Sequence, residues 1–271
     1  MKAGEAMILD RIAEATRIRV SKSREQLPLS EILERIQEGG QLKDFHNRSH
    51  TAFTEALRKE GMSVICEVKK ASPSKGVIAE EFPYLQIAEE YEAAGADAIS
   101  VLTEPDYFLG STQYLERISH RVGIPVLRKE FILEEYQLYE SKLIGADAVL
   151  LICSLLGEKL KQYLELCGKL KLSALVETHT EDEIRLALSA GAQVIGVNNR
   201  NLQTFEVDIR NSIRLRRLVP EEILFVAESG INSPEDMLQL REAGVDAVLI
   251  GEALMRSSDR RALLEYLKDS R

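Results

Sequence analysis

The chain has 271 residues, of which 45% are hydrophobic and 29% charged, and its formal net charge is −9. These proportions are typical of a globular protein that buries a sizeable core. The acidic balance argues against a nucleic-acid partner, because such proteins usually present a basic surface. The longest apolar runs are too short to cross a bilayer, and the first residues lack the apolar core of a signal peptide. We therefore expect a cytoplasmic protein with neither a membrane nor a nucleic-acid partner.

Cysteine and histidine spacing indicates no metal centre. The three cysteines, Cys66, Cys153 and Cys167, form no CxxC pair, and the four histidines form neither HxH nor HExxH. We expect the cysteines to be buried free thiols.

Two helical stretches are expected within the first sixty residues. The stretches "ILDRIAEATRIRV" (8–20) and "LSEILERI" (29–36) have apolar residues at helical spacing. No linker rich in Pro, Gly or Ser separates them from the strand that begins at Val64. We therefore treat residues 1–271 as a single domain, in which residues 1–60 form an N-terminal extension that caps one mouth of the rest.

A repeat organises the remaining chain. "AGADAISVL", "IGADAVLLI", "AGAQVIGVN" and "AGVDAVLIG" each end a helical pattern in glycine and continue into a β-rich run. The four glycines, Gly95, Gly145, Gly191 and Gly244, are 50, 46 and 53 residues apart. Four further strands are expected between these units, at 64–68, 125–129, 173–177 and 223–227. Helix starts are predicted at Thr180, as part of a capping box, and at Ser233, which precedes a proline.

Eight strands that alternate with helices predict a closed (β/α)8 barrel, the TIM barrel. The alternative is an open doubly wound sheet. That fold usually carries a GxGxxG phosphate fingerprint, which this chain lacks.

Charged side chains follow several of the predicted strands. Glu67 and Lys69 are two residues apart and therefore share a face, and Lys129 and Glu177 end two other strands. Asn198 and Arg200 share a face after the sixth strand. Any one of these could be an ion pair at the rim, but two Lys and two Glu in a common mouth could neutralise one another and act as acids and bases.

Three other charged residues near strand ends are expected to lie outside this group. Arg128 has the opposite parity to Lys129 and is expected to be structural. Glu228 has the opposite parity to Ser229 and is expected to pair outside the mouth. His179 follows a strand end alone and is expected to be a turn residue.

Glycine-containing turns follow the last two strands, "ESGI" (228–231) and "IGEAL" (250–254). Backbone N–H groups in such turns suit a phosphate group, and this is the usual phosphate position in TIM barrels. Ser72, beside Pro73, either caps a turn or contacts the ligand.

Seven stretches resemble the indole-3-glycerol-phosphate synthase family: "VICEVKKASPSKG", "ISVLTEPDYFLGS", "PVLRKEFI", "LVETH", "IGVNNRNLQTFEVD", "VAESGI" and "LIGEALM". The resemblance extends from about Ile8 to the C-terminal helix. It implies ring closure of 1-(2-carboxyphenylamino)-1-deoxyribulose 5-phosphate to indole-3-glycerol phosphate, with release of carbon dioxide and water. It also implies that no metal or organic cofactor is needed.

The resemblance assigns roles to individual residues. Lys129 would be the general acid of ring closure, and Lys69 would hold the substrate carboxylate and supply a later proton. Glu177 and Glu67 would be the acid and base candidates for dehydration, with Asn198 orienting substrate or Glu67. The positions implied to bind substrate are Ser72, Phe108, Arg200, Ser229, Gly230, Gly251 and Glu252.

The chain departs from the family pattern at two positions. Glu130 replaces an aspartate that many members carry, and Leu109 replaces a residue that is polar in some members. Two rival interpretations stay open: another phosphate-binding barrel enzyme, such as a phosphoribosylanthranilate isomerase with a Cys/Asp pair, and a non-catalytic scaffold. Transient contact with neighbouring tryptophan-pathway enzymes is also expected.

Overall fold

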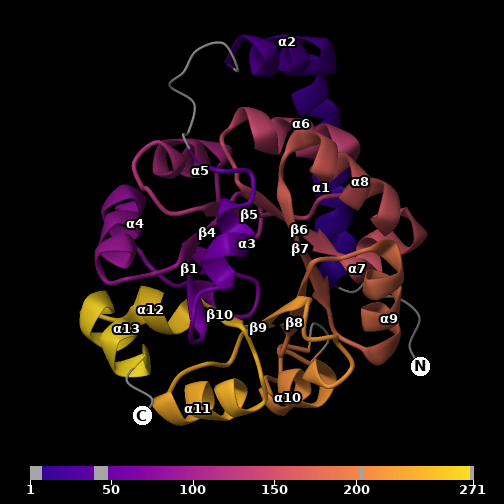
Figure 1. Ribbon diagram of the computed structural model, residues 1–271. Coiled ribbons are helices and arrows are strands. Elements are labelled where there is room, and N and C mark those ends of the chain that lie inside the picture. Colours follow the sequence, from indigo (N-terminus) through magenta and orange to yellow (C-terminus); the bar gives the residue numbers. More distant parts are fainter. Residues whose placement is uncertain (1–7, 40–47, 202–203, 269–271) are drawn as a thin grey trace.

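A closed barrel of eight parallel strands forms the centre of the protein, as predicted (Figure 1). The computed structural model describes residues 8–39, 48–201 and 204–268. The barrel strands are β1 (Ser63–Val68), β4 (Ala98–Leu102), β5 (Val126–Lys129), β6 (Ala148–Ile152), β7 (Ser173–Thr178), β8 (Val194–Asn198), β9 (Leu224–Glu228) and β10 (Ala247–Ile250). Each strand pairs with the next along the chain, and β1 closes the ring against β10.

Helices connect the strands and surround the barrel (Figure 1). They are α4 (Tyr84–Ala93), α5 (Thr112–Ser119), α6 (Glu135–Leu143), α7 (Cys153–Leu156), α8 (Leu160–Leu170), α9 (Glu181–Ala190), α10 (Arg210–Arg216), α11 (Pro234–Glu242), α12 (Glu252–Arg256) and α13 (Arg260–Lys268), with a short 3₁₀ helix at Gly157–Lys159. The four glycines of the repeat have φ between 80° and 90°, the left-handed conformation that ends a helix without a Cβ penalty. Thr180 and Ser233 cap α9 and α11 with their side chains, as predicted.

Strand residues alternate between two apolar layers. Ile65, Leu127, Leu175, Val226 and other inward residues fill the barrel interior. The residues between them face the helices and belong to the larger outer core. Because this alternation continues to the carboxyl ends of the strands, the last inward-facing residue of a strand points into the barrel mouth.

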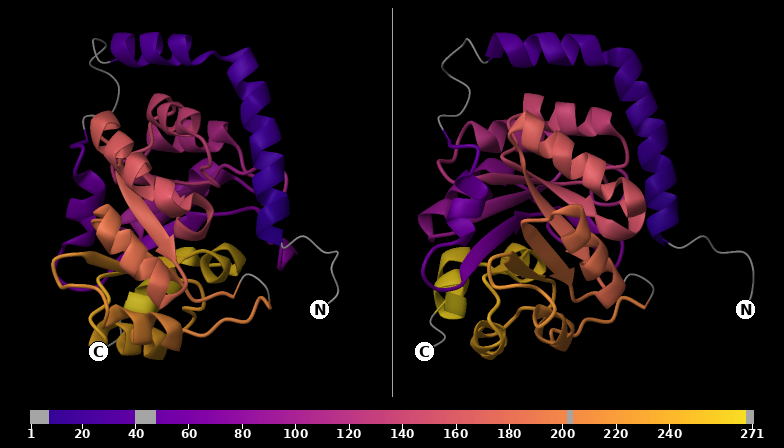
Figure 2. Two further views of the ribbon diagram at one scale, coloured as in Figure 1. Left: turned by 90° about the vertical axis from the view of Figure 1, so that its right-hand side faces the viewer. Right: turned by 45° about the vertical axis from the view of Figure 1, so that its right-hand side comes forward.

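The N-terminal extension contacts both ends of the barrel. Its described parts are α1 (Ile8–Gln26), α2 (Leu29–Gly39) and α3 (Ala52–Leu57); residues 1–7 and 40–47 of the predicted extension lie outside the described residues. Phe53 and Leu57 of α3 join the interior apolar cluster just before β1 begins, so this helix closes the amino end. Figure 2 shows α1 and α2 on the outside of the barrel.

Arg19 joins α1 to the carboxyl end of the barrel through ion pairs. Its guanidinium lies 3.2 Å from Glu104 in the loop after β4 and 3.1 Å from Glu130 after β5. Both carboxylates are buried. The extension was expected to cap one mouth of the barrel. Instead, α3 closes the amino end and α1 contacts the carboxyl end.

A small two-stranded sheet was not predicted. β2 (Ala71–Ser72) and β3 (Gly76–Val77) pair within the loop after β1. Ala71 N–H donates to the carbonyl of Phe108 at 3.2 Å, which joins this loop to the loop after β4.

The three cysteines are free and buried, as predicted. Burial raises the pKa of all three thiols. Within the described residues, no helix is long and apolar enough to cross a membrane.

Candidate active site

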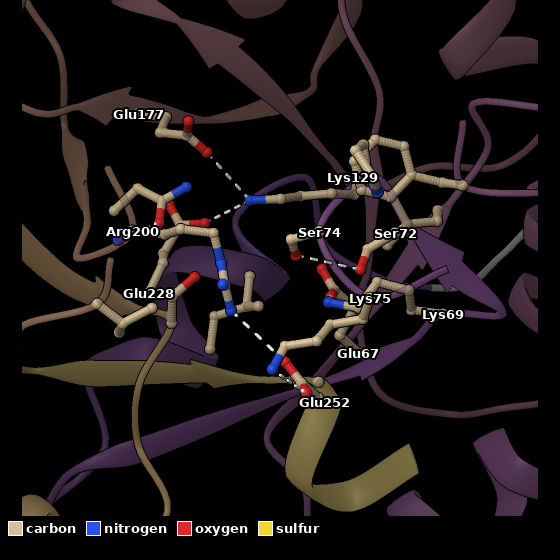
Figure 3. Close-up of a pocket in the computed structure, with 18 of the residues that line it drawn as sticks. Glu67, Lys69, Ser72, Ser74, Lys75, Lys129, Glu177, Arg200, Glu228 and Glu252 are labelled. Atoms are coloured by element: carbon tan, nitrogen blue, oxygen red, sulfur yellow. Dashed lines mark hydrogen bonds and ion pairs between the residues drawn. The ribbon is translucent and has the colours of Figure 1, made fainter. Parts of the chain in front are cut away.

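A cavity of about 610 Å³ opens at the carboxyl end of the barrel (Figure 3). All twelve residues proposed from the sequence as catalytic or substrate-binding line it: Glu67, Lys69, Ser72, Phe108, Lys129, Glu177, Asn198, Arg200, Ser229, Gly230, Gly251 and Glu252. Side chains distant in the sequence meet here because parallel strands present their carboxyl ends at one rim. Ile8, Leu9 and Ile12 of α1 complete the wall.

Lys129 lies at the centre of the charged groups. Its ammonium is 3.2 Å from Glu177 Oε2 on β7 and also forms an ion pair with Glu228 Oε2 on β9 (Figure 3). Burial disfavours the charged lysine, but the carboxylates of Glu228, Glu177 and Glu67 outweigh it and raise the pKa of Lys129. Lys129 is therefore held as an ammonium, the form that can donate a proton.

The two carboxyl groups beside Lys129 differ in their pKa shifts. Burial raises the pKa of Glu228 to about 7, and the neighbouring Glu177 adds to this against the opposing effect of Lys129. Burial also acts on Glu177, but Lys129, His179 and a hydrogen bond from Asn198 outweigh it and lower the pKa of this carboxyl. Glu177 is thus the carboxylate kept ionised, and Glu228 the one that can hold a proton near neutral pH.

Glu67, on β1, forms a second pair with Lys69, across the barrel from β7, which carries Glu177. Lys69 Nζ lies 2.5 Å from Glu67 Oε1, and Ser100 Oγ is 3.5 Å from Glu67 Oε2. Gly251 leaves room for this pair, because a Cβ there would lie 2.5 Å from Glu67 Oε1 and 3.1 Å from Lys69 Nζ. The absence of a side chain at 251 therefore has a specific steric reason.

Cations and glycine turns gather at one end of the cavity. Glu252, at the start of α12, lies 3.5 Å from both Lys75 Nζ and Arg200 Nη2 (Figure 3). Ser229 and Gly230 follow β9 with φ of 68° and 84°, so the chain turns sharply beside these cations. This end has the positive charge and the exposed backbone that an anionic group requires.

The prediction for Glu228 was wrong. It was expected to pair outside the mouth, yet its side chain is 2% exposed and contacts Lys129 inside. The expectation assumed that strand alternation continues through Ser229, but the positive φ of Ser229 ends it. Leu224 and Val226 face the barrel interior, and Glu228 has their parity, so a count from these two residues would have found it.

His179 also lies closer to the site than expected. It does occupy the turn after β7, but its ring lies 3.7 Å from Glu177. Arg128 is structural as predicted, because its guanidinium points away from the mouth and bonds Glu140 and Ser141 of α6.

The two departures from the family pattern lie at different distances from the charged groups. Glu130 lines the edge of the cavity, but its carboxylate contacts Arg19 at 3.1 Å and accepts a hydrogen bond from Thr103 at 2.8 Å. Leu109 is 39% exposed with φ of 53°, so its side chain occupies the rim. Among the described residues, no group of three or more His, Cys, Asp and Glu side chains is arranged to hold a metal ion.

Comparison with known proteins gives close matches over nearly the whole chain. The family model described as indole-3-glycerol phosphate synthase matches residues 9–267. A protein of that name from Ruminiclostridium cellulolyticum is 54% identical over 265 residues, 97% of this chain and 100% of the relative. Proteins of the same name from Lachnoclostridium phytofermentans and Endomicrobium trichonymphae are 51% and 53% identical, each over 97% of this chain and 99% and 100% of their own length.

Solved structures of lower identity share the fold. 3-Hexulose-6-phosphate synthase from Salmonella typhimurium superimposes with a TM-score of 0.63 at 16% identity, over 77% of this chain and 98% of its own. KGPDC from Streptococcus mutans gives 0.62 at 13% identity, over 78% and 97%. These likenesses concern the barrel alone.

Proposed function

The chain belongs to the indole-3-glycerol phosphate synthase family, and we propose that the cavity around Lys129 is where it carries out that family's reaction. The chain is a lyase of tryptophan biosynthesis. It acts on a phosphorylated small molecule, 1-(2-carboxyphenylamino)-1-deoxyribulose 5-phosphate. The products are indole-3-glycerol phosphate, carbon dioxide and water.

The substrate phosphate binds at the end formed by Ser72, Arg200, Ser229, Gly230 and Gly251. Lys75 supports this placement, because its ammonium and the Arg200 guanidinium converge on Glu252 and a phosphate would compete for both. The aromatic ring of the substrate then lies toward Phe108, which lines the cavity with its ring 6.0 Å from that of Phe131. The ketone between these two ends faces Lys129.

Ring closure begins at the substrate ketone. The ring carbon that bears the carboxylate attacks the carbonyl carbon, and the Lys129 ammonium donates a proton to the carbonyl oxygen as the carbon–carbon bond forms. The contacts with Glu177 and Glu228 support this role, since they keep Lys129 protonated until the oxygen becomes the stronger base. General acid catalysis of this kind contributes about 10²–10⁴-fold to a rate.

Two further bonds must break. Loss of carbon dioxide returns its bonding electrons to the ring and restores aromaticity; Lys69 holds the departing carboxylate. Dehydration then removes the hydroxyl group with a proton from Lys69 and removes a proton from the adjacent carbon to a carboxylate. We assign this base to Glu177 because its lowered pKa keeps it ionised and its partner Lys129 has already given up a proton by this step; Glu67 is the alternative. Asn198 orients Glu177 through its hydrogen bond.

The single observation that carries this proposal is the convergence of two lysines and three glutamates in one cavity: Lys69, Lys129, Glu67, Glu177 and Glu228. They supply both proton donors and acceptors. None of the three cysteines lines the cavity, so the Cys/Asp pair expected of the isomerase alternative has no cysteine there.

The test is formation of indole-3-glycerol phosphate from the carboxyphenylamino substrate in the presence of EDTA, followed by absorbance and fluorescence. Phosphoribosylanthranilate is offered in a parallel assay. We expect product from the first substrate only. Turnover of phosphoribosylanthranilate alone, or product only with added metal, would refute the proposal.

We also propose that the N-terminal helices and barrel act as one unit in the cytoplasm. Transient contact with neighbouring pathway enzymes would use the loops around the mouth. The exposed apolar side chains there, Val77, Leu109 and Phe205, support such a contact. Chemical crosslinking with those enzymes would test it.

A further inference from the structure

The imidazole of His179 lies between two carboxylates. Nε2 is 3.7 Å from Glu177 Oε1, and Nδ1 is 3.6 Å from Glu183 Oε2. The residue follows β7 directly, so Glu177 and His179 come from the same strand end, while Glu183 comes from the first turn of α9. The side chain of His179 is 18% exposed.

The backbone holds this ring in place. His179 N–H donates to Glu183 Oε2 at 2.6 Å, and the His179 carbonyl accepts from Asn211 Nδ2 at 3.4 Å. These bonds explain the turn, but they do not explain the direction of the ring. Nε2 is buried and makes no hydrogen bond, although it faces the nearest oxygen of Glu177. A buried polar atom without a hydrogen-bond partner is rare and needs an explanation, and a role in the active site would provide one.

We propose that His179 is a positioning residue that acts through Glu177, holding Oε1 of that carboxylate while Lys129 holds Oε2. This inference rests on the role proposed above for Glu177. Glu183 anchors the imidazole from behind, so the three side chains form a line that runs from α9 to the cavity.

The charges around His179 favour its cationic form. Glu177 on β7, Glu183 on α9 and Glu228 on β9 all face it, and Lys129 on β5 is already engaged by two of these carboxylates. Burial acts against the imidazolium, but the hydrogen bond and charge of Glu183 and the charge of Glu177 outweigh it and raise the pKa of His179.

The proposed reaction explains why Glu177 needs a second cation beside it. When Lys129 donates its proton to the ketone oxygen, it becomes a neutral amine, and Glu177 loses the cation on Oε2. A second cation on Oε1 keeps the carboxylate ionised and aimed at the cavity for the dehydration that follows.

The kinetic test compares His179→Asn with His120→Asn, a matched change at an exposed histidine on the C-terminal end of α5. Removing the imidazolium raises the pKa of Glu177, so we expect the acidic limb of the kcat/KM profile to move up by about one pH unit. KM at pH 8 should stay within about twofold, since His179 does not line the cavity. Glu183→Gln, which can still accept the backbone hydrogen bond, should shift the same limb by a smaller amount.

The second test needs no turnover. In the NMR spectrum of the protein labelled with ¹⁵N-histidine, the His179 imidazole is assigned by its loss in His179→Asn. Its pKa should fall by about one unit in Glu177→Gln. An unchanged titration in that variant, or a pH profile of His179→Asn that matches His120→Asn, would overturn the proposal. Wild-type turnover by Glu177→Gln would instead refute the role of Glu177 itself, whatever the titration gives.

Discussion

Lys129 and its two carboxylate partners set the chemistry of the site at the scale of single residues. Glu177 and Glu228 contact the same ammonium, yet their pKa values move in opposite directions, because burial dominates at Glu228 and nearby cations dominate at Glu177. Gly196 makes this crowding possible: a side chain on β8 at this position would overlap the Glu228 carboxylate. Catalytic sites commonly contain such paired groups with divergent pKa values.

Replacement of Glu228 by Gln tests this balance. Glu228 helps to raise the pKa of Lys129, so its removal lowers that pKa, and the general acid is lost at a lower pH. Because the raised pKa of Lys129 places the basic limb of the wild-type kcat profile above pH 10.5, we expect wild-type kcat to stay flat up to that pH and kcat of Glu228→Gln to fall within the measured range. The profile is measured from pH 7 to 10.5, with the exposed Glu242→Gln as control. Identical profiles for the two variants would contradict the assigned contact.

Much of the site could be predicted from the sequence, since the charged residues at strand ends were visible and the family resemblance gave them roles. The place of Glu228 does not follow from the parity of Ser229, because Ser229 lies beyond the strand and has a positive φ. His179 lies in a turn as predicted, and its approach to Glu177 follows from the two-residue spacing that also brings Lys69 beside Glu67.

At the scale of elements, the cavity depends on loops from different β/α units. Figure 3 shows Glu252 of α12 beside Lys75, from the loop after β1, and Arg200, from the loop after β8. The eight strands and the helix-ending glycines could be predicted because they repeat. The β2–β3 pair and α3 could not, because two-residue strands and a six-residue helix carry too little periodicity.

Replacement of Glu252 by Gln tests how these loops receive the phosphate. The Glu252 carboxylate pairs with Lys75 and Arg200, the two cations that we expect the substrate phosphate to contact. Removing its charge should therefore strengthen substrate binding. Because the group is partly exposed, we expect KM to fall only about two- to fivefold, with kcat unchanged. Glu265→Gln, on the exposed face of α13, is the control. A higher KM would mean that Glu252 contacts the substrate directly.

At the scale of the whole molecule, a protein with net charge −9 places four cations in the cavity where we propose that its substrate binds: Lys69, Lys75, Lys129 and Arg200. The end of the cavity where Lys75 and Arg200 share the single carboxylate of Glu252 attracts the phosphate group, while the acidic remainder of the surface repels it. Closure of the amino end by α3 leaves the carboxyl end as the entrance, and the extension thereby contributes to the direction of approach.

Salt should weaken this attraction. Raising the ionic strength from about 0.05 to 0.5 M shortens the screening length well below 10 Å, so KM should rise several-fold. The value of kcat should change little, because the buried Lys129 contacts are poorly screened. Sodium chloride and potassium glutamate are compared, to separate screening from chloride binding. A KM independent of both salts would contradict a cationic entrance.

The most direct test of the central claim is steady-state formation of indole-3-glycerol phosphate by Lys129→Ala beside Lys161→Ala, a matched change on the exposed face of α8. If Lys129 is the general acid, its loss should reduce kcat by at least about 10²-fold. Circular dichroism should show a folded barrel in both variants, and Lys161→Ala should keep wild-type turnover. Near-normal turnover by a folded Lys129→Ala protein would contradict the account.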